Sequence, residues 1–461
     1  MDAPRRMLLN AFSMNCVSHI HHGMWTRDDT TQRNYHALEP WLELATLLER
    51  GRFDALFLAD VVGLYDTYRA GADTSIREAM QVPVNDPAML IPAMATVTKH
   101  LGFAFTSSVL QSHPFTFARQ VSTLDHLTRG RVGWNIVTSY LNNAATNLGY
   151  DRLPSHDERY AQADEYLEVT YKLWEASWDD DAVVNDPVRR VYADPAKIRR
   201  IDHQGPHYRV TGPHLSEPSP QRTPLLFQAG SSDRGRDFAA RHAECIFLMT
   251  TRSALKGERS VVADIRRRAA ALGRRANDLR FFQGLSPVVG ATETEARQKA
   301  DDYLACLSTE GALAHISGSV GVDLSAVDPD QPLTSIETES VRGLIKEMID
   351  SAPAGTSTFR DLIRRRMAGQ FLIGTPEQIA DALTTWFEAG IDGFNLVYTV
   401  TPGSFADFVD GVVPVLQDRG LVQREYSPGT LRAKLFGASD LPSSHPARTH
   451  RFARSASKSG A

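Results

Sequence analysis

Short apolar runs alternate with amphipathic segments along most of the chain, and this alternation restricts the fold more than any other feature. Eight runs have the length and the flanking turn residues of buried strands: 8–12, 55–59, 102–107, 132–137, 225–228, 245–249, 281–289 and 393–397. Helical periodicity predicts helices over 38–50, 88–100, 116–127, 156–174, 234–242, 260–273, 292–307 and 376–389. Strands that alternate with helices form parallel βαβ units, so the sequence predicts an α/β fold, a (β/α)8 TIM barrel.

The 461 residues exceed the roughly 250 that such a barrel needs, and the surplus interrupts the alternation in three places. Residues 140–155 and 178–222 are rich in Pro, Asp, His and Gly, and residues 311–358 carry Gly, Ser, Asp and Pro without a clean period. We therefore expect one barrel domain over 1–435 with these three insertions. The end of the chain, 436–461, is expected to form a flexible tail because it becomes rich in Ser, Arg and Lys.

Composition excludes several classes of protein. A content of 42% hydrophobic and 23% charged residues is typical of a globular protein, and a net charge of −5 argues against general nucleic-acid binding. No apolar stretch approaches the ~20 residues that cross a membrane, and the first apolar run is too short for a signal peptide. Cys16, Cys245 and Cys306 are far apart, so we expect a reducing, cytoplasmic location and no structural zinc.

Residues 227–238 read FQAGSSDRGRDF, the pattern of a strand, a tight turn and the start of a helix. Gly230 ends the strand, and Ser231 and Ser232 follow it directly. A helix N-terminus presents free N–H groups and the positive end of the helix dipole, so the turn predicts a phosphate site. Any βα loop can share this pattern, and an ordinary turn is the alternative interpretation.

Polar residues also follow other predicted strands. In a TIM barrel these ends share the face that carries the active site, so we expect the residues to converge. They are Asp60, Thr106, Asn135 and Ser139 and, at the start of the next predicted helix, His156 and Tyr160. Asn135 could equally be a satisfied core amide, and His156 and Tyr160 a half-buried aromatic pair near a helix end.

Three histidines fall within four residues in the segment SHIHHG, residues 18–23. No neighbouring carboxylate or cysteine completes a ligand set, so we expect no metal. His19 is the candidate acid–base group, and His315, inside the last insertion, is a second candidate. Either could instead be a surface histidine.

Four apolar residues at predicted strand positions form the candidate substrate pocket. They are Phe12, Phe57, Phe247 and Met249. Each could belong to the barrel core instead of an apolar pocket above a flat cofactor.

Several segments carry a resemblance to a known family, among them NCVSHIHHGMW, LLERGRFDALFLAD, HPFTFARQVSTLDHLTRGRVGWNIVTS, PLLFQAGSSDRGRDFAARHAE and GTPEQIADAL. Over about 7–435 the chain resembles the bacterial-luciferase-like flavin monooxygenases, in the branch with nitrilotriacetate monooxygenase, dibenzothiophene-sulfone monooxygenase and pristinamycin synthase. The resemblance implies a two-component system. A separate NAD(P)H:FMN reductase would supply FMNH2, and this chain would use it with O2 to oxygenate an organic substrate. It also suggests a homodimer or homotetramer.

The resemblance further implies which residues contact the flavin. The isoalloxazine ring would lie beside Asp60 and Thr106. Its edge and the ribityl chain would contact Asn135, Val137 and Ser139. The ribityl and phosphate groups would be held by His156, Tyr160, Gly230, Ser231 and Ser232.

The chain departs from the sulfone-cleaving members, which carry a histidine where this insertion has Ser319, four residues after His315. The expected substrate is a small organic or xenobiotic compound that is aromatic, including halogenated ones, or resembles an aminopolycarboxylate. One alternative is a deazaflavin (F420)-dependent hydride-transfer oxidoreductase on the same barrel. The other is a flavin-binding partner protein without catalytic activity.

Overall fold

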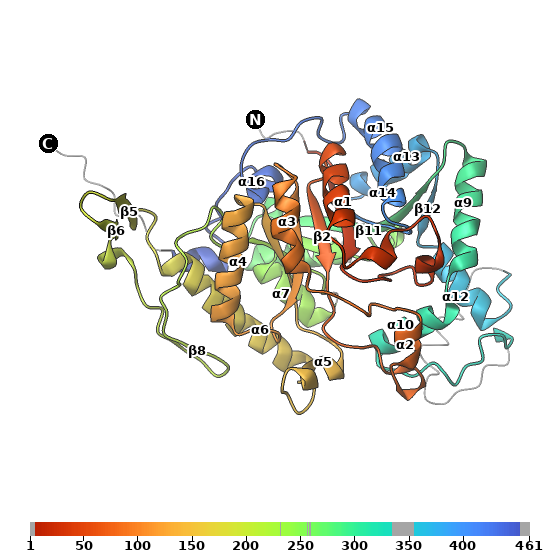
Figure 1. The fold of residues 1–461 in the computed structure, drawn as a ribbon, viewed down its shortest axis with the longest axis horizontal. Helices are drawn as coiled ribbons and strands as arrows, with labels where there is room; N and C mark the ends of the chain where they lie inside the picture. Colours follow the sequence, from red (N-terminus) through yellow and green to blue (C-terminus); the bar gives the residue numbers. More distant parts are fainter. Residues whose placement is uncertain (1–4, 231, 256, 258–259, 334–354, 452–461) are drawn as a thin grey trace. The chain divides into compact units, whose positions relative to one another are not determined.

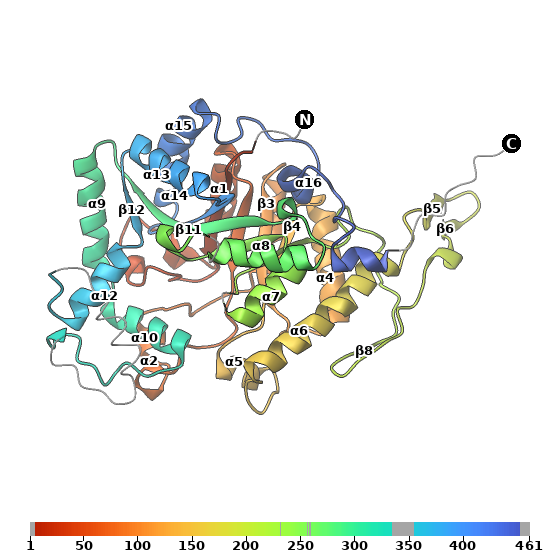
Figure 2. The same cartoon turned by 180° about the vertical axis from the view of Figure 1, so that it is seen from behind.

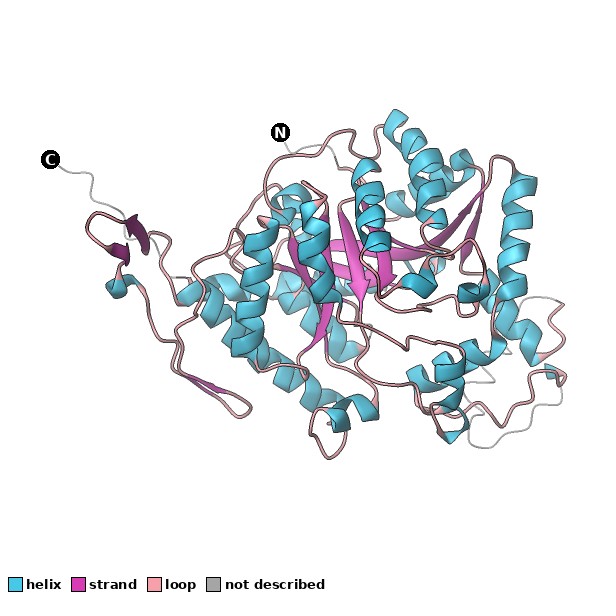
Figure 3. Cartoon of the chain, viewed as in Figure 1, coloured by secondary structure: helices cyan, strands magenta, loops and turns pink. Residues whose placement is uncertain are grey.

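A computed structural model describes residues 5–230, 232–255, 257, 260–333 and 355–451 of the chain. Its main sheet has the strand order β10-β9-β4-β3-β2-β1-β13-β11-β12, and β10 pairs in addition with β11. Eight parallel strands therefore close into a barrel with helices around it, as the secondary-structure colours show (Figure 1 and Figure 3). The predicted (β/α)8 fold is confirmed.

All eight predicted strands are present, and their ends differ from the prediction by at most two residues. The barrel strands are β1 (Leu8–Met14), β2 (Ala55–Ala59), β3 (Gly102–Ser108), β4 (Val132–Val137), β9 (Leu225–Gln228), β10 (Cys245–Leu248), β11 (Arg280–Val289) and β13 (Gly393–Val397), with β12 (Phe371–Gly374) beside β11. The strand position predicted for Met249 is wrong, because β10 ends one residue earlier and this side chain is 60% exposed.

Helices follow most of the strands. They are α1 (Glu39–Arg50), α2 (Asp73–Arg77), α3 (Ile91–Thr96), α4 (Pro114–Thr128), α5 (Asn142–Asn147), α6 (His156–Tyr171), α7 (Asp233–His242), α8 (Val261–Ala271), α9 (Glu293–Cys306), α10 (Thr309–Val320), α12 (Phe359–Ala368), α13 (Pro376–Glu388), α14 (Gly403–Asp407), α15 (Val413–Asp418) and α16 (Leu431–Phe436). The helix predicted over 88–100 is instead a 3-10 turn followed by the short α3, because Pro92 favours a helix start. No helix in the described part of the chain is long and apolar enough to cross a membrane.

The three predicted insertions contain short elements. Residues 140–155 include α5, and residues 178–222 form two antiparallel ribbons, β5 (Val183–Asp186) with β6 (Val191–Ala193) and β7 (His203–Gln204) with β8 (Arg209–Val210). The third insertion begins within α10, a helix that the sequence did not predict. Its residues 334–354 lie outside the described residues.

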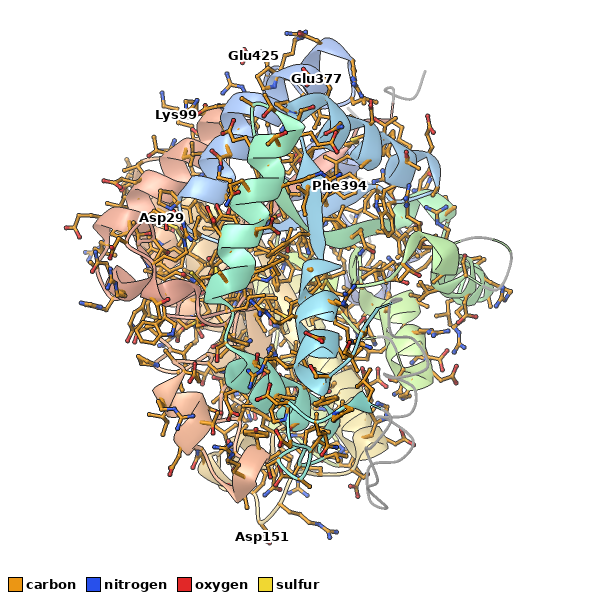
Figure 4. The ribbon with its side chains drawn as sticks, turned by 90° about the vertical axis from the view of Figure 1, so that its right-hand side faces the viewer. Asp29, Lys99, Asp151, Glu377, Phe394 and Glu425 are labelled. Atoms are coloured by element: carbon orange, nitrogen blue, oxygen red, sulfur yellow. The ribbon has the colours of Figure 1, made fainter. Side chains whose placement is uncertain are left out.

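The chain divides into two compact units. Unit 1 contains Met1–Leu101, Ser139–Leu153 and Gln283–Glu425, and unit 2 contains Gly102–Thr138, Pro154–Phe282 and Tyr426–Ala461. In unit 1, Phe394 of β13 is buried in the interior, whereas Lys99 and Glu425 are exposed at the surface (Figure 4).

The core of unit 2 includes an aromatic cluster around Trp134 of β4. The ring of Trp134 lies 4.6 Å from that of Phe117 on α4 and 5.9 Å from that of Tyr166 on α6. These contacts pack both helices against the strand. Helices α7 and α8, also in unit 2, lie side by side (Figure 2).

Residues from α16 onward are also packed in unit 2. Arg432, on α16, donates from Nε to Oε1 of Glu244 over 2.7 Å, and the two side chains are 1% and 2% exposed. His445 is buried, and its Nε2 bonds the carbonyl oxygen of His242 over 2.9 Å. Packed residues therefore continue beyond α16, and the part of the predicted flexible tail at 452–461 lies outside the described residues.

Candidate active site

The predicted phosphate turn lies in unit 2 between β9 and α7. Ser232 caps α7, and its Oγ accepts a 3.0 Å hydrogen bond from the Gly235 N–H. The same hydroxyl lies 3.1 Å from Nε2 of His156, the first residue of α6. A capping box formed by Ser155 and Glu158 fixes the start of α6. Two capped helix starts therefore meet at Ser232.

Tyr160 lies one turn after His156 on α6, and the two rings are 5.0 Å apart. A Cβ built on Gly230 would lie 2.8 Å from the Tyr160 hydroxyl and would overlap Nε2 of Gln228. Only glycine allows the backbone to approach Tyr160 this closely. Burial raises the pKa of Tyr160, so its hydroxyl keeps its proton and can donate.

Positive charge adjoins this turn. The guanidinium of Arg234 lies 5.5 Å from the centre of the Tyr160 ring and pairs with the carboxylate of Asp164. The structure thus brings together His156, Tyr160, Gly230 and Ser232 as predicted. Ser231 lies outside the described residues.

Thr106 and Asn135 are cross-strand neighbours in unit 2, on β3 and β4. Asn135 donates from Nδ2 to Oγ1 of Thr106 over 2.9 Å. Its Oδ1 is buried and has no hydrogen-bond partner among the described residues, and the same is true of Oε1 of Gln228. A buried acceptor without a donor is costly, so both atoms favour a ligand that donates hydrogen bonds.

The other predicted flavin contacts also follow strands. Val137 is the last residue of β4, opposite Ser108 of β3. Asp60 directly follows β2, and Ser139, with φ of 61°, lies in the turn after β4. Asp60 and Ser139 belong to unit 1, and their contacts with a flavin stay predictions.

The loop after β1 buries its three histidines in unit 1, where His19, His21 and His22 are only 1–2% exposed. None of them is a surface histidine. Nε2 of His22 lies 2.8 Å from Nδ1 of His315 on α10, and Nε2 of His21 lies 2.9 Å from Oγ of Ser286 on β11. In the described part of the chain, no group of three or more His, Cys, Asp or Glu side chains is placed to hold a metal ion.

Aromatic rings surround His19. Its ring lies 4.7 Å from that of Phe12 and 6.1 Å from that of Tyr398, and Phe12 lies 5.3 Å from Phe57. Phe12 and Phe57 are buried. Nδ1 of His19 is buried without a partner among the described residues. An apolar wall therefore stands beside an imidazole nitrogen that could bind a ligand.

Burial makes these histidines neutral. It lowers the pKa of His19 to about 3 and those of His21 and His315 to about 4, and it holds the pKa of His22 well below its usual range. A neutral imidazole donates from one nitrogen and accepts at the other. At neutral pH the group can therefore direct hydrogen bonds but carries no positive charge.

Three polar residues that the sequence pattern does not indicate contact the histidines of unit 1, directly or through one another: Tyr65, Tyr140 and Gln81. The ring of Tyr65 lies 5.1 Å from that of His315, and its hydroxyl contacts the Tyr140 hydroxyl and donates to Oε1 of Gln81. Gln81 in turn donates to the His19 carbonyl over 2.9 Å. These partners are separated by many residues and follow no common period, so no sequence pattern indicates them.

Known proteins match almost the whole chain. The luciferase-like monooxygenase family model matches residues 14–393. The chain is 48% identical to the dimethyl-sulfide monooxygenase of Hyphomicrobium sulfonivorans, over 97% of this chain and 94% of that protein. It is 49% identical to the long-chain alkane monooxygenase of Geobacillus thermodenitrificans, over 97% and 98%.

Solved structures agree with these matches. The crystal structure of DmoA from Hyphomicrobium sulfonivorans is similar with a TM-score of 0.90 and 47% identity, over 97% of this chain and 96% of that chain. A riboflavin lyase solved with modified FMN and riboflavin has a TM-score of 0.86 and 35% identity, over 97% and 100%.

The barrel and these similarities define an oxygenase that uses a flavin. The chain belongs to the luciferase-like monooxygenase family. The predicted branch is confirmed as well. Relatives at 37%, 34% and 36% identity are dibenzothiophene-sulfone monooxygenase, a component of nitrilotriacetate monooxygenase and a subunit of pristinamycin IIA synthase.

Proposed function

We propose that the chain is the oxygenase component of a two-component system. It takes FMNH2 from a separate NAD(P)H:FMN reductase and uses O2 to oxygenate a small organic compound. The observation that carries this proposal is the phosphate turn of unit 2, where His156 bonds Ser232 at the start of α7. Two relatives are named as parts of larger enzymes, nitrilotriacetate monooxygenase and pristinamycin IIA synthase, which supports the existence of a partner protein.

The residues of unit 2 fit FMN. The Ser232 hydroxyl, the His156 ring, the Tyr160 hydroxyl and the first N–H groups of α7 would hold the phosphate. The unpartnered oxygens of Asn135 and Gln228 would accept hydrogen bonds from the ring edge or the ribityl chain. When bound, the reduced flavin supplies the electrons that activate O2.

His19 and His315 are the proposed acid–base groups of unit 1. Both are neutral at pH 7, so each can donate or accept one proton through a nitrogen that faces a ligand. His19 is almost fully buried, so water is excluded from it and its hydrogen bonds are strengthened.

We infer that the substrate is an uncharged, largely apolar molecule. Phe12 packs on His19, and neutral histidines offer no positive charge to pair with carboxylates. An aminopolycarboxylate would therefore bind poorly here, whereas a thioether, an alkane or a halogenated aromatic compound meets the requirement. Relatives named for dimethyl sulfide and long-chain alkanes support this inference.

Stopped-flow mixing tests the cofactor. The protein is loaded anaerobically with reduced FMN and mixed with oxygenated buffer, with reduced F420 in a parallel experiment. We expect tight binding of FMNH2 and reoxidation clearly slower than that of the free flavin. Reoxidation at the free rate together with tight F420 binding would overturn the proposal in favour of hydride transfer.

Product analysis tests the substrate. Thioethers, alkanes and halogenated aromatics are incubated with the protein, FMN, NADH, a flavin reductase and ¹⁸O2. We expect one labelled oxygen atom in the product of at least one uncharged compound. Labelled product from nitrilotriacetate alone would contradict the inference.

A further inference from the structure

A chain of hydrogen bonds in unit 1 connects Ser18, His22 and His315, and we call it the histidine relay. Oγ of Ser18 lies 3.0 Å from Nδ1 of His22, and Nε2 of His22 lies 2.8 Å from Nδ1 of His315. Among the described residues, every ring nitrogen of the relay except Nε2 of His315 has a hydrogen-bond partner. That atom is the one left to meet a ligand.

Close backbone packing fixes the relay. Gly23, with φ of +99°, lies against the backbone of Cys306 and Ser308, where any Cβ would overlap. The N–H of Ser308, which caps α10, donates to the His22 carbonyl over 2.9 Å. A Cβ on Gly311 would lie 2.9 Å from Cβ of His22. These contacts therefore fix the position of α10, which carries His315, relative to His22.

The hydroxyl of Ser18 determines which ring nitrogens of His22 and His315 carry a proton. Ser18 is fully buried, and among the described residues its Oγ has no hydrogen-bond partner other than Nδ1 of His22. If His22 donated from Nδ1, the hydroxyl proton of Ser18 would be buried with no acceptor, which is unfavourable. Ser18 therefore donates, and the proton of His22 is on Nε2. His22 then donates to Nδ1 of His315, so the proton of His315 is on Nε2.

We propose that Ser18 and His22 are positioning residues that hold His315 as its Nε2–H tautomer, so that His315 meets its ligand as a hydrogen-bond donor. The tautomer follows from the relay alone. Its effect on turnover rests on the proposed function of His315. A donor at this atom stabilises negative charge that develops on an oxygen of the reacting molecules, whereas the opposite tautomer would present a lone pair to it.

The tautomer matters because His315 is neutral. Burial lowers its pKa to about 4, so at neutral pH it has one N–H only. A protonated ring would donate from both nitrogens and would need no relay.

NMR of the flavin-free protein tests the tautomer directly. Histidine with ¹⁵N-labelled rings is incorporated, and long-range ¹H–¹⁵N correlations show which nitrogen of each ring bears the proton. The His315 signals are identified by their loss in His315→Gln. We expect the Nε2–H form in the wild type. An Nδ1–H form would overturn the proposal.

Substitutions test the cause. Ser18→Ala frees His22 to donate from Nδ1, so His315 should become Nδ1–H or a mixture. His22→Phe removes the partner of His315 and should also give a mixture. His22→Gln can still donate to Nδ1 of His315 and should keep the Nε2–H form. The control is His21→Gln, because His21 bonds Ser286 and lies outside the relay.

An unchanged tautomer in both Ser18→Ala and His22→Phe would overturn the proposal. The histidine correlations also report whether each variant is folded. The two substitutions are independent tests, so the loss of one variant to misfolding leaves the other.

Turnover separates this proposal from the proposed function. We expect Ser18→Ala and His22→Phe to lower kcat roughly tenfold, the effect of one weakened hydrogen bond, with KM and FMN affinity unchanged and with recovery in His22→Gln. If the wild type oxygenates nothing, the proposed function fails, but the tautomer result stands. If the wild type oxygenates its substrate while His315 is Nδ1–H, only the relay proposal fails.

Discussion

The phosphate turn of unit 2 and the histidine relay of unit 1 use the same residue type in opposite ways. The His156 side chain is 44% exposed, and Asp157 and Ser232 are within hydrogen-bonding distance of its ring. His22 of the relay, and His19 in the same loop, are almost fully buried and surrounded by uncharged groups. An exposed polar site can bind an anion at low desolvation cost, whereas buried imidazoles must remain neutral. Affinity for the cofactor and the chemistry of the reaction should therefore be separable by mutation.

Removal of either proposed acid–base histidine should have the largest effect. For His19→Ala and His315→Ala we expect turnover to fall about 100- to 10,000-fold, the range of a lost acid–base group. FMN affinity, measured by fluorescence titration, should stay unchanged. His36→Ala, an exposed histidine of unit 1, is the matched control. If turnover is normal, or if FMN affinity falls as much as turnover, the two regions do not have separate roles.

The buried histidines of unit 1 are neutral, whereas unit 2 buries a paired charge, Arg432 with Glu244. The substitution Arg432→Met tests how much that pairing stabilises the fold. The substitution leaves Glu244 buried without its partner, and we expect the free energy of unfolding to fall by about 3–5 kcal/mol. Urea denaturation measures the change. Arg50→Met is the control, because its pair with Asp410 is 58% and 59% exposed and should contribute less than ~1 kcal/mol. Equal losses in the two variants would contradict the argument from burial.

Substitutions in the phosphate turn should change affinity alone. For His156→Ala and Ser232→Ala we expect FMN to bind roughly 10- to 150-fold more weakly, from about 1.5–3 kcal/mol per charge-assisted hydrogen bond. Riboflavin, which has no phosphate, should bind almost as before. Ser260→Ala removes the cap of α8 in the same way and serves as the control. Equal weakening of FMN and riboflavin would show that Ser232 only caps its helix.

Acid should reduce stability through the buried histidines. The folded-state pKa values of His21 and His315 are about 4, below the 6.5 of an unfolded chain, so unfolding takes up protons between these values. The contribution of these neutral histidines to the free energy of unfolding is therefore fully present above pH 6.5. It falls as the pH drops toward 4, by up to ~1.4 kcal/mol per pH unit for each group.

Urea midpoints at pH 7, 6 and 5 measure this slope. His21→Gln should make the slope shallower by the contribution of one proton, relative to His36→Ala. A slope that is identical in the two variants would contradict the assignment.

The strands were predictable because each is an apolar run between turn residues, as at 225–228 before Gly230. Helix α10 was not predictable, because its glycines are typical of loops. Gly318 lies where a Cβ would overlap the ring of Tyr65, and Gly311 packs on His22. Both glycines serve tertiary packing, which outweighs local propensity.

The site was predictable in part for a similar reason. The phosphate turn lies mostly in one segment, so local pattern indicated Gly230 and Ser232. The partner of His22 is 293 residues away, and no local pattern links the two. Residues whose roles depend on such pairs, Ser18 and Tyr65 among them, become evident only once the chain is folded.

The ion pair between Glu244 and Arg432 has a consequence for folding during translation. The two residues are 188 positions apart, so at ~5–20 residues per second the carboxylate emerges roughly 10–40 s before its guanidinium. During that interval the Glu244 carboxylate lacks the guanidinium that hydrogen-bonds it in the folded protein, so closing the interior of unit 2 would bury it without that partner. Translation of α16 thus sets the earliest moment at which unit 2 can reach its final packing.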